Sequence, residues 1–121
     1  MESGALLGIR VLIVEDEMAI AMMLEDFLHD LGCTVVAMAG RIPEAIKAIA
    51  DHPIDVAILD LNLDGQRSYG VADALTERGI PYLFSTGYGL SGLEERYRNS
   101  PMLKKPFQPE DLEAALAAIV R

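Results

Sequence analysis

Short apolar runs alternate with segments of helical periodicity along the whole chain, and this alternation limits the fold more than any other feature. The first run, residues 11–14, is fully apolar and largely β-branched, as expected of a strand covered on both faces. Further runs of this kind occupy residues 34–38, 56–59, 82–84 and 102–103. Parallel strands need crossover connections, which are usually helices. The pattern therefore predicts an α/β fold, in which a doubly wound five-stranded parallel sheet has helices on both faces.

Amphipathic helices are expected between the strands and after the last one. The stretch 18–31 carries an apolar stripe and is followed by Gly32, a residue type that often ends helices. A second helix is expected to have Pro43 in its first turn. Its inner face is expected to consist of Ile42, Ala45, Ile46 and Ile49. A polar loop then leads to the remaining helices, expected around residues 71–75, at 93–98 and from Pro109 onward.

Polar residues interrupt this pattern where the strands end. Glu15 and Asp16 follow the first strand, and Asp60 ends the third. Thr86 ends the fourth strand and Lys105 follows the fifth. In an open parallel sheet, ligands bind beyond the carboxyl ends of the strands, where the strand order reverses. If the order is 2-1-3-4-5, the first and third strands are neighbours at that point. The three acids then converge on one pocket, with the threonine and the lysine beside it.

Three neighbouring carboxylates repel one another, so either one is protonated or a cation binds between them. Oxygen ligands without Cys or His select Mg²⁺, or Mn²⁺ as a substitute, over zinc. An ion held by few protein oxygens keeps open positions for a phosphoryl group. Lys105 would add a second positive charge, the Thr86 hydroxyl would add a hydrogen bond, and an Asp carboxylate is a known nucleophile in such transfers.

Four segments resemble the signatures of response-regulator receiver domains. They read Val-Leu-Ile-Val-Glu-Asp-Glu at 11–17, Ile-Leu-Asp-Leu-Asn at 58–62, Phe-Ser-Thr-Gly at 84–87 and Leu-Lys-Lys-Pro-Phe at 103–107. The resemblance runs from about Ile9 to the C-terminus and implies one flavodoxin-like receiver domain of strand order 2-1-3-4-5. A receiver accepts a phosphoryl group from a histidine kinase and is not a conventional enzyme.

The resemblance also assigns roles to residues of the pocket. It implies that Asp60 is the phosphoacceptor. It implies that Asp16, Asp60 and the main-chain carbonyl of Asn62 bind Mg²⁺ directly, and that Glu15 acts through a water. Glu15 stands where many receivers have Asp, a variation that leaves metal binding intact.

Further implications concern the switch itself. Thr86 would supply the switch hydroxyl, and Lys105 rather than Lys104 would be the functional lysine, followed by a cis bond to Pro106. Many receivers place an aromatic residue three positions before this lysine, where this chain has Met102. The inward swing of an aromatic ring is therefore not expected here.

A narrower resemblance concerns the segment Pro-Tyr-Leu-Phe-Ser-Thr-Gly-Tyr at 81–88. It is similar to the Pro-Phe-X-Phe-Ala-Thr-Gly-X-Tyr segment of the FAT GUY receivers, and stretches 64–69 and 71–75 also resemble that group. Those are mostly stand-alone receivers of alphaproteobacteria, linked to general stress signalling and to HWE/HisKA2 sensor kinases. We expect Tyr88 to lie beside the pocket.

The expected partners are a sensor histidine kinase and a downstream protein. In receivers the first helix packs against the kinase, and residues 18–24 carry no charge. Part of Met18, Ala19, Met22 and Met23 should therefore be exposed. The downstream partner would bind the face formed by helix 93–98, strand 102–103 and the last helix. No sequence follows that helix here, so the output would be a partner protein or the removal of phosphoryl groups from a kinase; alternatively, the chain was excised from a longer protein.

Composition excludes other classes of function. The formal net charge of −9 argues against binding nucleic acid, which needs clustered Lys and Arg. No apolar run is long enough to span a membrane, and the N-terminus lacks the basic region of a signal peptide, so a cytoplasmic protein is expected.

Two alternatives to an active receiver share part of this pattern. A haloacid-dehalogenase-type phosphohydrolase also uses an Asp at a strand end, but it needs a second Asp two residues later, where this chain has Asn62. A pseudo-receiver that is never phosphorylated and serves only for docking is the other alternative. The complete set of acids, threonine and lysine argues against it.

Overall fold

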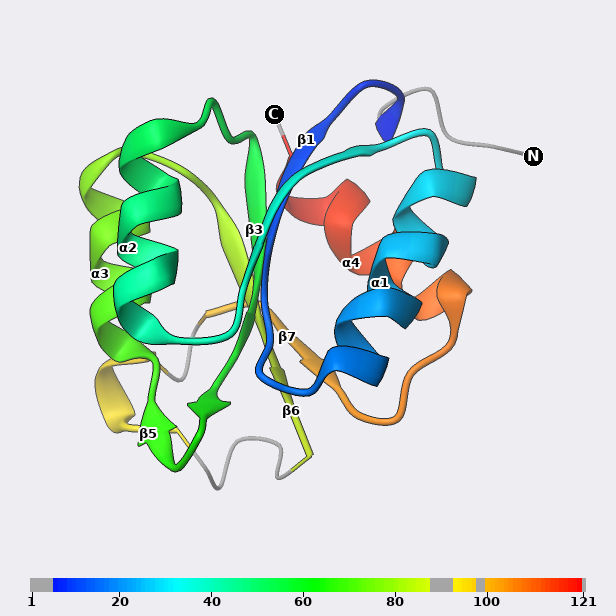
Figure 1. The fold of residues 1–121 in the computed structure, drawn as a ribbon. Coiled ribbons are helices and arrows are strands. Elements are labelled where there is room, and N and C mark those ends of the chain that lie inside the picture. Colours follow the sequence, from blue (N-terminus) through cyan, green and yellow to red (C-terminus); the bar gives the residue numbers. More distant parts are fainter. Residues whose placement is uncertain (1–5, 88–92, 98–99, 121) are drawn as a thin grey trace.

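The central sheet of the computed structural model consists of five parallel strands in the order β2-β1-β3-β6-β7 (Figure 1). The strands are β1 (Arg10–Val14), β2 (Thr34–Ala39), β3 (Val56–Asp60), β6 (Tyr82–Thr86) and β7 (Met102–Lys104). The structure describes residues 6–87, 93–97 and 100–120. The predicted doubly wound sheet of order 2-1-3-4-5 is confirmed, because β6 and β7 are the fourth and fifth strands of this sheet.

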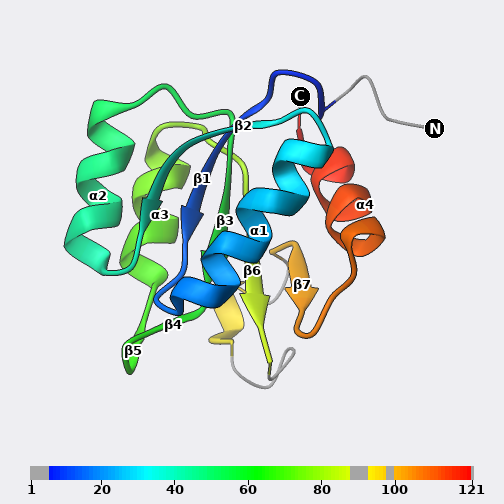
Figure 2. The same cartoon turned by 45° about the vertical axis from the view of Figure 1, so that its right-hand side comes forward.

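Two pairs of helices cover the two faces of the sheet, as Figures 1 and 2 show. Helices α1 (Met18–Asp30) and α4 (Pro109–Ile119) lie on one face. Helices α2 (Ile42–Asp51) and α3 (Tyr69–Glu77) lie on the other. None of the helices in the described part of the chain is both long and apolar enough to cross a membrane.

The sheet divides the core into two hydrophobic clusters. Side chains alternate along β1, so that Leu12 and Val14 pack on the α2–α3 side while Val11 and Ile13 pack on the α1–α4 side. All four are at most 1% exposed. A strand buried on both faces needs apolar residues at every position, which is why the predicted strands read as continuous apolar runs.

The inner face of α2 differs from the prediction. Ala45, Ala48 and Ile49 are buried, whereas Ile46 is 39% exposed. Residues three and four positions apart share a helix face, and a neighbouring residue points about 100° away. The buried face is therefore centred between Ala45 and Ile49, and Ile46 lies at its solvent edge.

Two further segments differ from expectation. In place of a helix at 93–98, the structure has one short 3₁₀ turn, η3 (Glu95–Tyr97), and Arg98 lies outside the described residues. Of this segment only Leu93 and Tyr97 are buried, which leaves too small an apolar face to fix a longer helix. The stretch expected as a polar loop contains a small antiparallel hairpin, β4 (Asn62–Leu63) and β5 (Gln66–Arg67).

Candidate functional site

Three acidic side chains meet at the carboxyl edge of the sheet. Glu15 and Asp16 directly follow β1, and Asp60 is the last residue of the neighbouring strand β3. Carboxylate oxygens of all three lie within 4.8 Å of one another. Glu15 and Asp60 are only 5% and 6% exposed, whereas Asp16 is open to solvent. The structure thus brings together the three acids that the sequence placed at strand ends.

Lys105 reaches this acid cluster from the segment after β7. Its Nζ lies 3.1 Å from Glu15 Oε1 and 3.3 Å from Asp60 Oδ2. The main-chain N–H of Lys105 donates to the carbonyl of Thr86 at 2.8 Å, which fixes the start of the segment beside β6. The Lys105–Pro106 bond is cis, as the resemblance implied. The neighbouring Lys104 side chain is exposed.

Within the described part of the chain, Lys105 balances the charges of this cluster only in part. Burial raises the pKa of Glu15 to about 7; the N–H of Glu17 and the charge of Lys105 lower this pKa, while Asp60 raises it. Burial also disfavours the ammonium of Lys105, but the charges of Asp60 and Glu15 outweigh this effect and raise its pKa. One ammonium therefore faces three carboxyl groups.

The acid cluster fits a divalent cation. Its donors are carboxylate oxygens, the ligand type that Mg²⁺ and Mn²⁺ prefer. The group combines two buried acids with one exposed acid, so one side of the cluster remains open to solvent. A cation would favour the charged carboxylate of Glu15 and so oppose the two effects that raise its pKa, chiefly burial and then repulsion from Asp60.

The β4–β5 hairpin supports the cluster through its backbone. The N–H of Asn62 donates to Asp60 Oδ1 at 3.1 Å, and the N–H of Asp64 donates to Asp16 Oδ2 at 2.9 Å. This hairpin was not predicted from the sequence, although Asp64-Gly65 is a strong signal for a two-residue hairpin turn. Both residues have positive φ, 51° and 84°, as the preferred turn requires.

Ser68 is a second supporting residue, and its role was not predicted from the sequence. Its side chain is fully buried, and its Oγ donates to the main-chain carbonyl of Asp60 at 2.6 Å and lies 3.3 Å from that of Leu61. The Ser68 N–H also donates to the Leu61 carbonyl. No sequence motif marked this serine, because the hydrogen bond depends on how the hairpin returns to β3.

Two polar residues at the end of β6 border the cluster. Thr86 is 3% exposed, and the preceding residue, Ser85, pairs in register with Asp60 on β3. The Ser85 hydroxyl is buried and has no hydrogen-bond partner in the described part of the chain. A polar residue inside an otherwise apolar strand was the available signal for Ser85.

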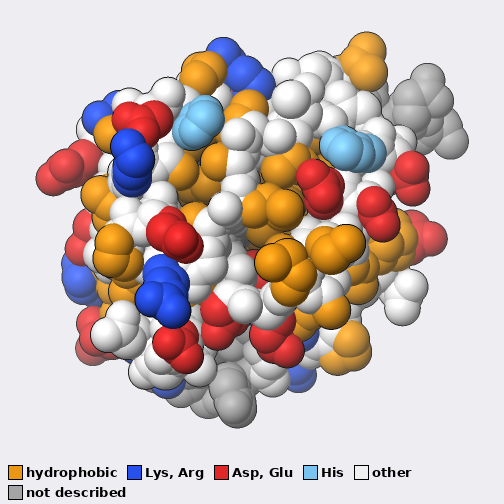
Figure 3. Space-filling model, in the orientation of Figure 1, with side chains coloured by type: hydrophobic (Ala, Val, Ile, Leu, Met, Phe, Trp, Pro, Cys, Tyr) orange, Lys and Arg blue, Asp and Glu red, His pale blue; other side chains and the backbone are white. Residues whose placement is uncertain are grey.

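The surface of α1 is apolar near its first turns. Met18 and Met22 are 68% and 54% exposed, Ala19 is exposed and Met23 is half-buried, in agreement with the expectation from the uncharged segment. Figure 3 shows hydrophobic side chains gathered over this half of the helix, with acidic side chains toward its other end. Tyr88, expected beside the pocket, lies outside the described residues.

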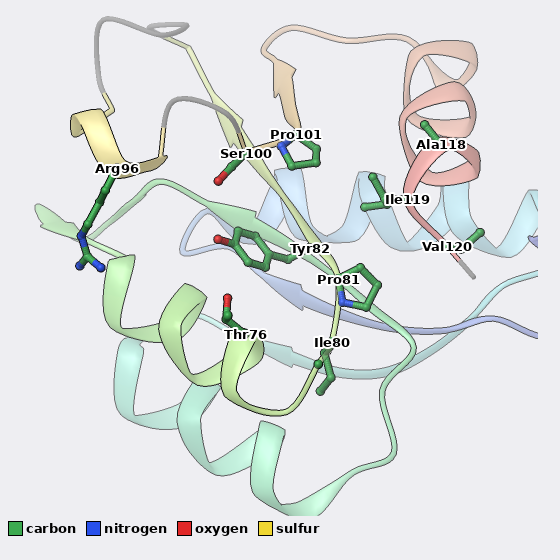
Figure 4. Close-up of a pocket in the computed structure, with 11 residues that line it drawn as sticks. Thr76, Ile80, Pro81, Tyr82, Arg96, Ser100, Pro101, Ala118, Ile119 and Val120 are labelled. Carbon is green, nitrogen blue, oxygen red and sulfur yellow. The ribbon is translucent and has the colours of Figure 1, made fainter.

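A large hollow of about 660 Å³ lies elsewhere (Figure 4). It is bordered by the start of β6, by Arg96, by the residues before β7 and by the end of α4. Pro81, Pro101 and Ile119 form much of its apolar wall, and the acid cluster is not part of it. It lies at the amino edge of the sheet, opposite the acids.

Comparisons with known proteins identify the family. The sequence model of the Response regulator receiver domain matches residues 11–117. The chain belongs to this family. A receiver domain is a phosphoacceptor signalling module rather than a conventional enzyme.

Solved receiver structures are similar over nearly the whole chain. The solution structure of SdrG from Sphingomonas melonis Fr1 has a TM-score of 0.83 and 44% sequence identity, covering 96% of this chain and 98% of that one. The structure of the BeF3-activated conformation of SdrG, from Pseudomonas melonis Fr1, has a TM-score of 0.82 and 45% identity, covering 93% and 96% of the two chains.

A curated relative extends beyond the matched region. The phyllosphere-induced regulator PhyR of Methylorubrum extorquens is 34% identical over 96% of this chain and 45% of its own length. The chain spans about half the length of the first curated relatives that it matches. The shared region is therefore the receiver part of these proteins.

Proposed function

We propose that Asp60 accepts a phosphoryl group from a histidine kinase and that the resulting aspartyl phosphate shifts the domain between two conformations. One observation carries this proposal: three acids lie within 4.8 Å of one another, and the Lys105 ammonium lies 3.3 Å from the Asp60 carboxylate. Membership in the receiver family supports the reaction, and the BeF3-activated conformation solved for SdrG supports the switching.

The divalent cation would be held by Asp16, Asp60 and the main-chain carbonyl of Asn62, with Glu15 acting through a water. When bound, Mg²⁺ supplies positive charge that neutralises the oxygens of a transferring phosphoryl group. Mn²⁺ offers the same coordination chemistry as a substitute. Asp16 is the exposed member of the cluster, so it borders the path by which an ion enters.

The residues of the chain have separable roles in the transfer. An oxygen of the Asp60 carboxylate forms a bond to phosphorus, and the bond from phosphorus to the donor nitrogen breaks, with its electron pair left on the donor imidazole. Lys105 neutralises charge on the phosphoryl oxygens, and the Thr86 hydroxyl donates a hydrogen bond to one of them. The N–H of Asn62, which donates to Asp60 Oδ1 at 3.1 Å, keeps the carboxylate oriented.

The phosphoryl donor would be a sensor kinase, of the HWE/HisKA2 type if the chain is a FAT GUY receiver like those of the stress-response group. The 44% identity to SdrG supports this narrower placement.

We propose that residues 1–121 act as one receiver unit in the cytoplasm, without binding DNA. The kinase would dock on the exposed Met18 and Met22, because flexible Met side chains repack easily against a partner.

The phosphorylated domain would act on a downstream protein through the face formed by η3, β7 and α4, or would drain phosphoryl groups from the kinase. Both outputs need the same phosphorylated Asp60. The alternative is a docking module that is never phosphorylated. Such a module would gain no phosphoryl group when it is incubated with a donor.

Labelling with acetyl phosphate tests the proposal. The wild-type domain is incubated with acetyl phosphate with and without Mg²⁺, and intact mass reports the gain of one phosphoryl group. We expect Mg²⁺-dependent gain in the wild type and none in Asp60→Asn. Asp64→Asn is the matched control, because the contact of Asp64 with the cluster is made by its main-chain N–H, which the substitution keeps, and an Asn tolerates its positive φ. Absence of labelling in the wild type would establish the docking module instead.

A further inference from the structure

A pair of stacked tyrosines joins the start of α3 to η3. The rings of Tyr69 and Tyr97 lie parallel, with centroids 4.2 Å apart and an interplanar angle of 3°. Phe84, on β6, meets both rings edge-on, at 6.2 Å and 5.9 Å. Tyr69 and Tyr97 are only 9% and 5% exposed. Figure 1 shows η3, in yellow, beside the end of α3 nearest the hairpin.

Polar contacts at both tyrosine hydroxyls reinforce the stack. The Tyr69 hydroxyl accepts the N–H of Glu94 at 2.8 Å, and the Tyr97 hydroxyl donates to Asp73 Oδ1 on α3 at 2.7 Å. The guanidinium of Arg96 lies 4.3 Å from the Tyr97 ring centre and 3.5 Å from Asp73 Oδ2. Burial and the Asp73 carboxylate raise the pKa of Tyr97, so its hydroxyl keeps its proton. The ring stack, the hydrogen bonds at the two hydroxyls and the Arg96–Asp73 ion pair thus hold the segment 94–97 to α3.

The same stack is connected to the phosphoacceptor by one residue. Ser68 immediately precedes Tyr69, and its Oγ donates to the Asp60 carbonyl at 2.6 Å. Ser68 is fully buried, so solvent does not compete for this hydrogen bond. A single peptide unit therefore separates the residue bonded to the Asp60 main chain from the ring stacked on Tyr97.

Met102 offers no comparable connection. It is half-buried against the α2–α3 cluster, and its thioether is at most a weak acceptor. Tyr69 combines a flat ring with a hydroxyl that accepts a main-chain N–H, so a displacement of its backbone moves two directional contacts at once.

We propose that Ser68 and Tyr69 form a positioning pair that transmits the state of Asp60 to residues 94–97. Tyr69 would thus do what the aromatic residue at the position of Met102 does in many receivers. This inference rests on the proposed phosphorylation of Asp60. Charge added at Asp60 alters the end of β3, Ser68 follows the Asp60 carbonyl, and Tyr69 then changes its overlap with Tyr97. Release of Tyr97 from Asp73 would free the η3 segment, which belongs to the proposed output face.

Nuclear magnetic resonance with beryllium fluoride and Mg²⁺ tests this coupling. The amide signal of Glu94 and the ring signals of Tyr97 are followed in the wild type, Tyr69→Leu, Tyr69→Phe and Ser68→Ala. Tyr82→Phe is the control for the loss of a nearby tyrosine hydroxyl, because Tyr82 acts on Tyr97 electrostatically and contacts Phe84 edge-on at 5.3 Å, whereas Tyr69 stacks on the Tyr97 ring. The Asp60 and Asn62 amides report occupation of the pocket in every variant, and circular dichroism reports folding.

We expect Tyr69→Leu to respond at Asp60 and Asn62 like the wild type, while the response at Glu94 and Tyr97 falls below half of the wild-type change. Tyr69→Phe keeps the stack and should lose mainly the Glu94 response, and Tyr82→Phe should retain both. A wild-type response at Tyr97 in folded Tyr69→Leu would overturn the proposal.

Failure of the proposed function looks different. In that case the wild-type protein itself shows no Mg²⁺-dependent response at Asp60 and Asn62. The structural connection from Asp60 through Ser68 and Tyr69 to Tyr97 can still be tested without any ligand. The Tyr97 ring signals of Ser68→Ala are compared with those of the wild type. Unchanged Tyr97 signals in that variant would overturn the connection independently of phosphorylation. If Tyr69→Leu does not fold, a wild-type response at Glu94 in Tyr69→Phe, or at Tyr97 in Ser68→Ala, would overturn the proposal.

Discussion

Replacement of Glu15 by Gln should make the metal-free protein more stable at neutral and alkaline pH. Glu15 is 5% exposed, and its folded pKa of about 7 lies above the ordinary value of 4.5. An acid with a raised pKa binds more protons in the folded than in the unfolded state between these two values, so stability falls as the pH rises through them. The ionised Glu15 therefore lowers the unfolding free energy. This destabilisation is absent below pH 4.5 and complete above pH 7.

The size of the penalty follows from the two pKa values. At about 1.4 kcal/mol per pH unit, the interval corresponds to roughly 3 kcal/mol of unfolding free energy. Most of this difference between Glu15→Gln and the wild type should develop between pH 5 and pH 8. Bound Mg²⁺ stabilises the folded state by mass action, and it should do so more in the wild type than in the variant, which lacks one carboxylate of the cluster.

Urea unfolding followed by circular dichroism measures the effect, with chelator and then with Mg²⁺, at several pH values. Glu77→Gln is the matched control, because Glu77 is exposed at the last residue of α3. It removes a carboxylate from the protein surface and shows what the loss of one exposed charge does to the unfolding free energy. A difference between Glu15→Gln and the wild type that stays constant from pH 5 to pH 8 would refute the reasoning that burial of the Glu15 charge destabilises the metal-free site.

Four further outcomes are expected. Lys105→Ala should lower labelling by acetyl phosphate at least tenfold, and Lys104→Ala should change it less than twofold, as measured by intact mass; equal losses would contradict the assignment. Ser85→Ala should raise the unfolding free energy by about 1 kcal/mol in urea titrations, because it removes a buried hydroxyl without a partner among the described residues. Met22→Glu should slow phosphotransfer from the cognate kinase while acetyl phosphate labelling stays unchanged; loss with both donors would indicate damage to the pocket instead. The Met102 side chain should stay in place when beryllium fluoride binds, so its methyl signal should change little. A large change of this signal would show that Met102 swings inward as the aromatic residue of other receivers does.

The strand pattern and the acid cluster were predictable because each depends on local sequence and one topological rule. Residues 11–14 and 56–59 read as strands buried on both faces, and parallel strands end at the same edge of a sheet. Once β1 and β3 are neighbours, Glu15 and Asp60 must lie close together. The family resemblance then assigned roles that spacing alone leaves open.

The remaining features depend on tertiary contacts that no local pattern encodes. Ile46 has the same apolar character as Ile49, and only the orientation of α2 on the sheet decides which one is buried. Leu93 and Tyr97 are four residues apart, a spacing typical of one helix face, yet the conformation of this segment is set by the stack of Tyr97 on Tyr69. Ser68 lies in a polar stretch, and its hydrogen bond to the Asp60 carbonyl exists only because the hairpin returns to β3.

The two ion pairs of Lys105 also bear on how the domain acquires its activity during folding. The lysine is 90 residues from Glu15 and 45 residues from Asp60 along the chain, so these contacts close some of the longest loops in the protein. Contacts of long sequence separation form late, because their loop-closure entropy is offset only when the intervening structure is in place. An emerging or partly opened chain therefore contains the acids without their lysine. Competence for phosphorylation belongs to the completed domain and disappears when either end of it opens.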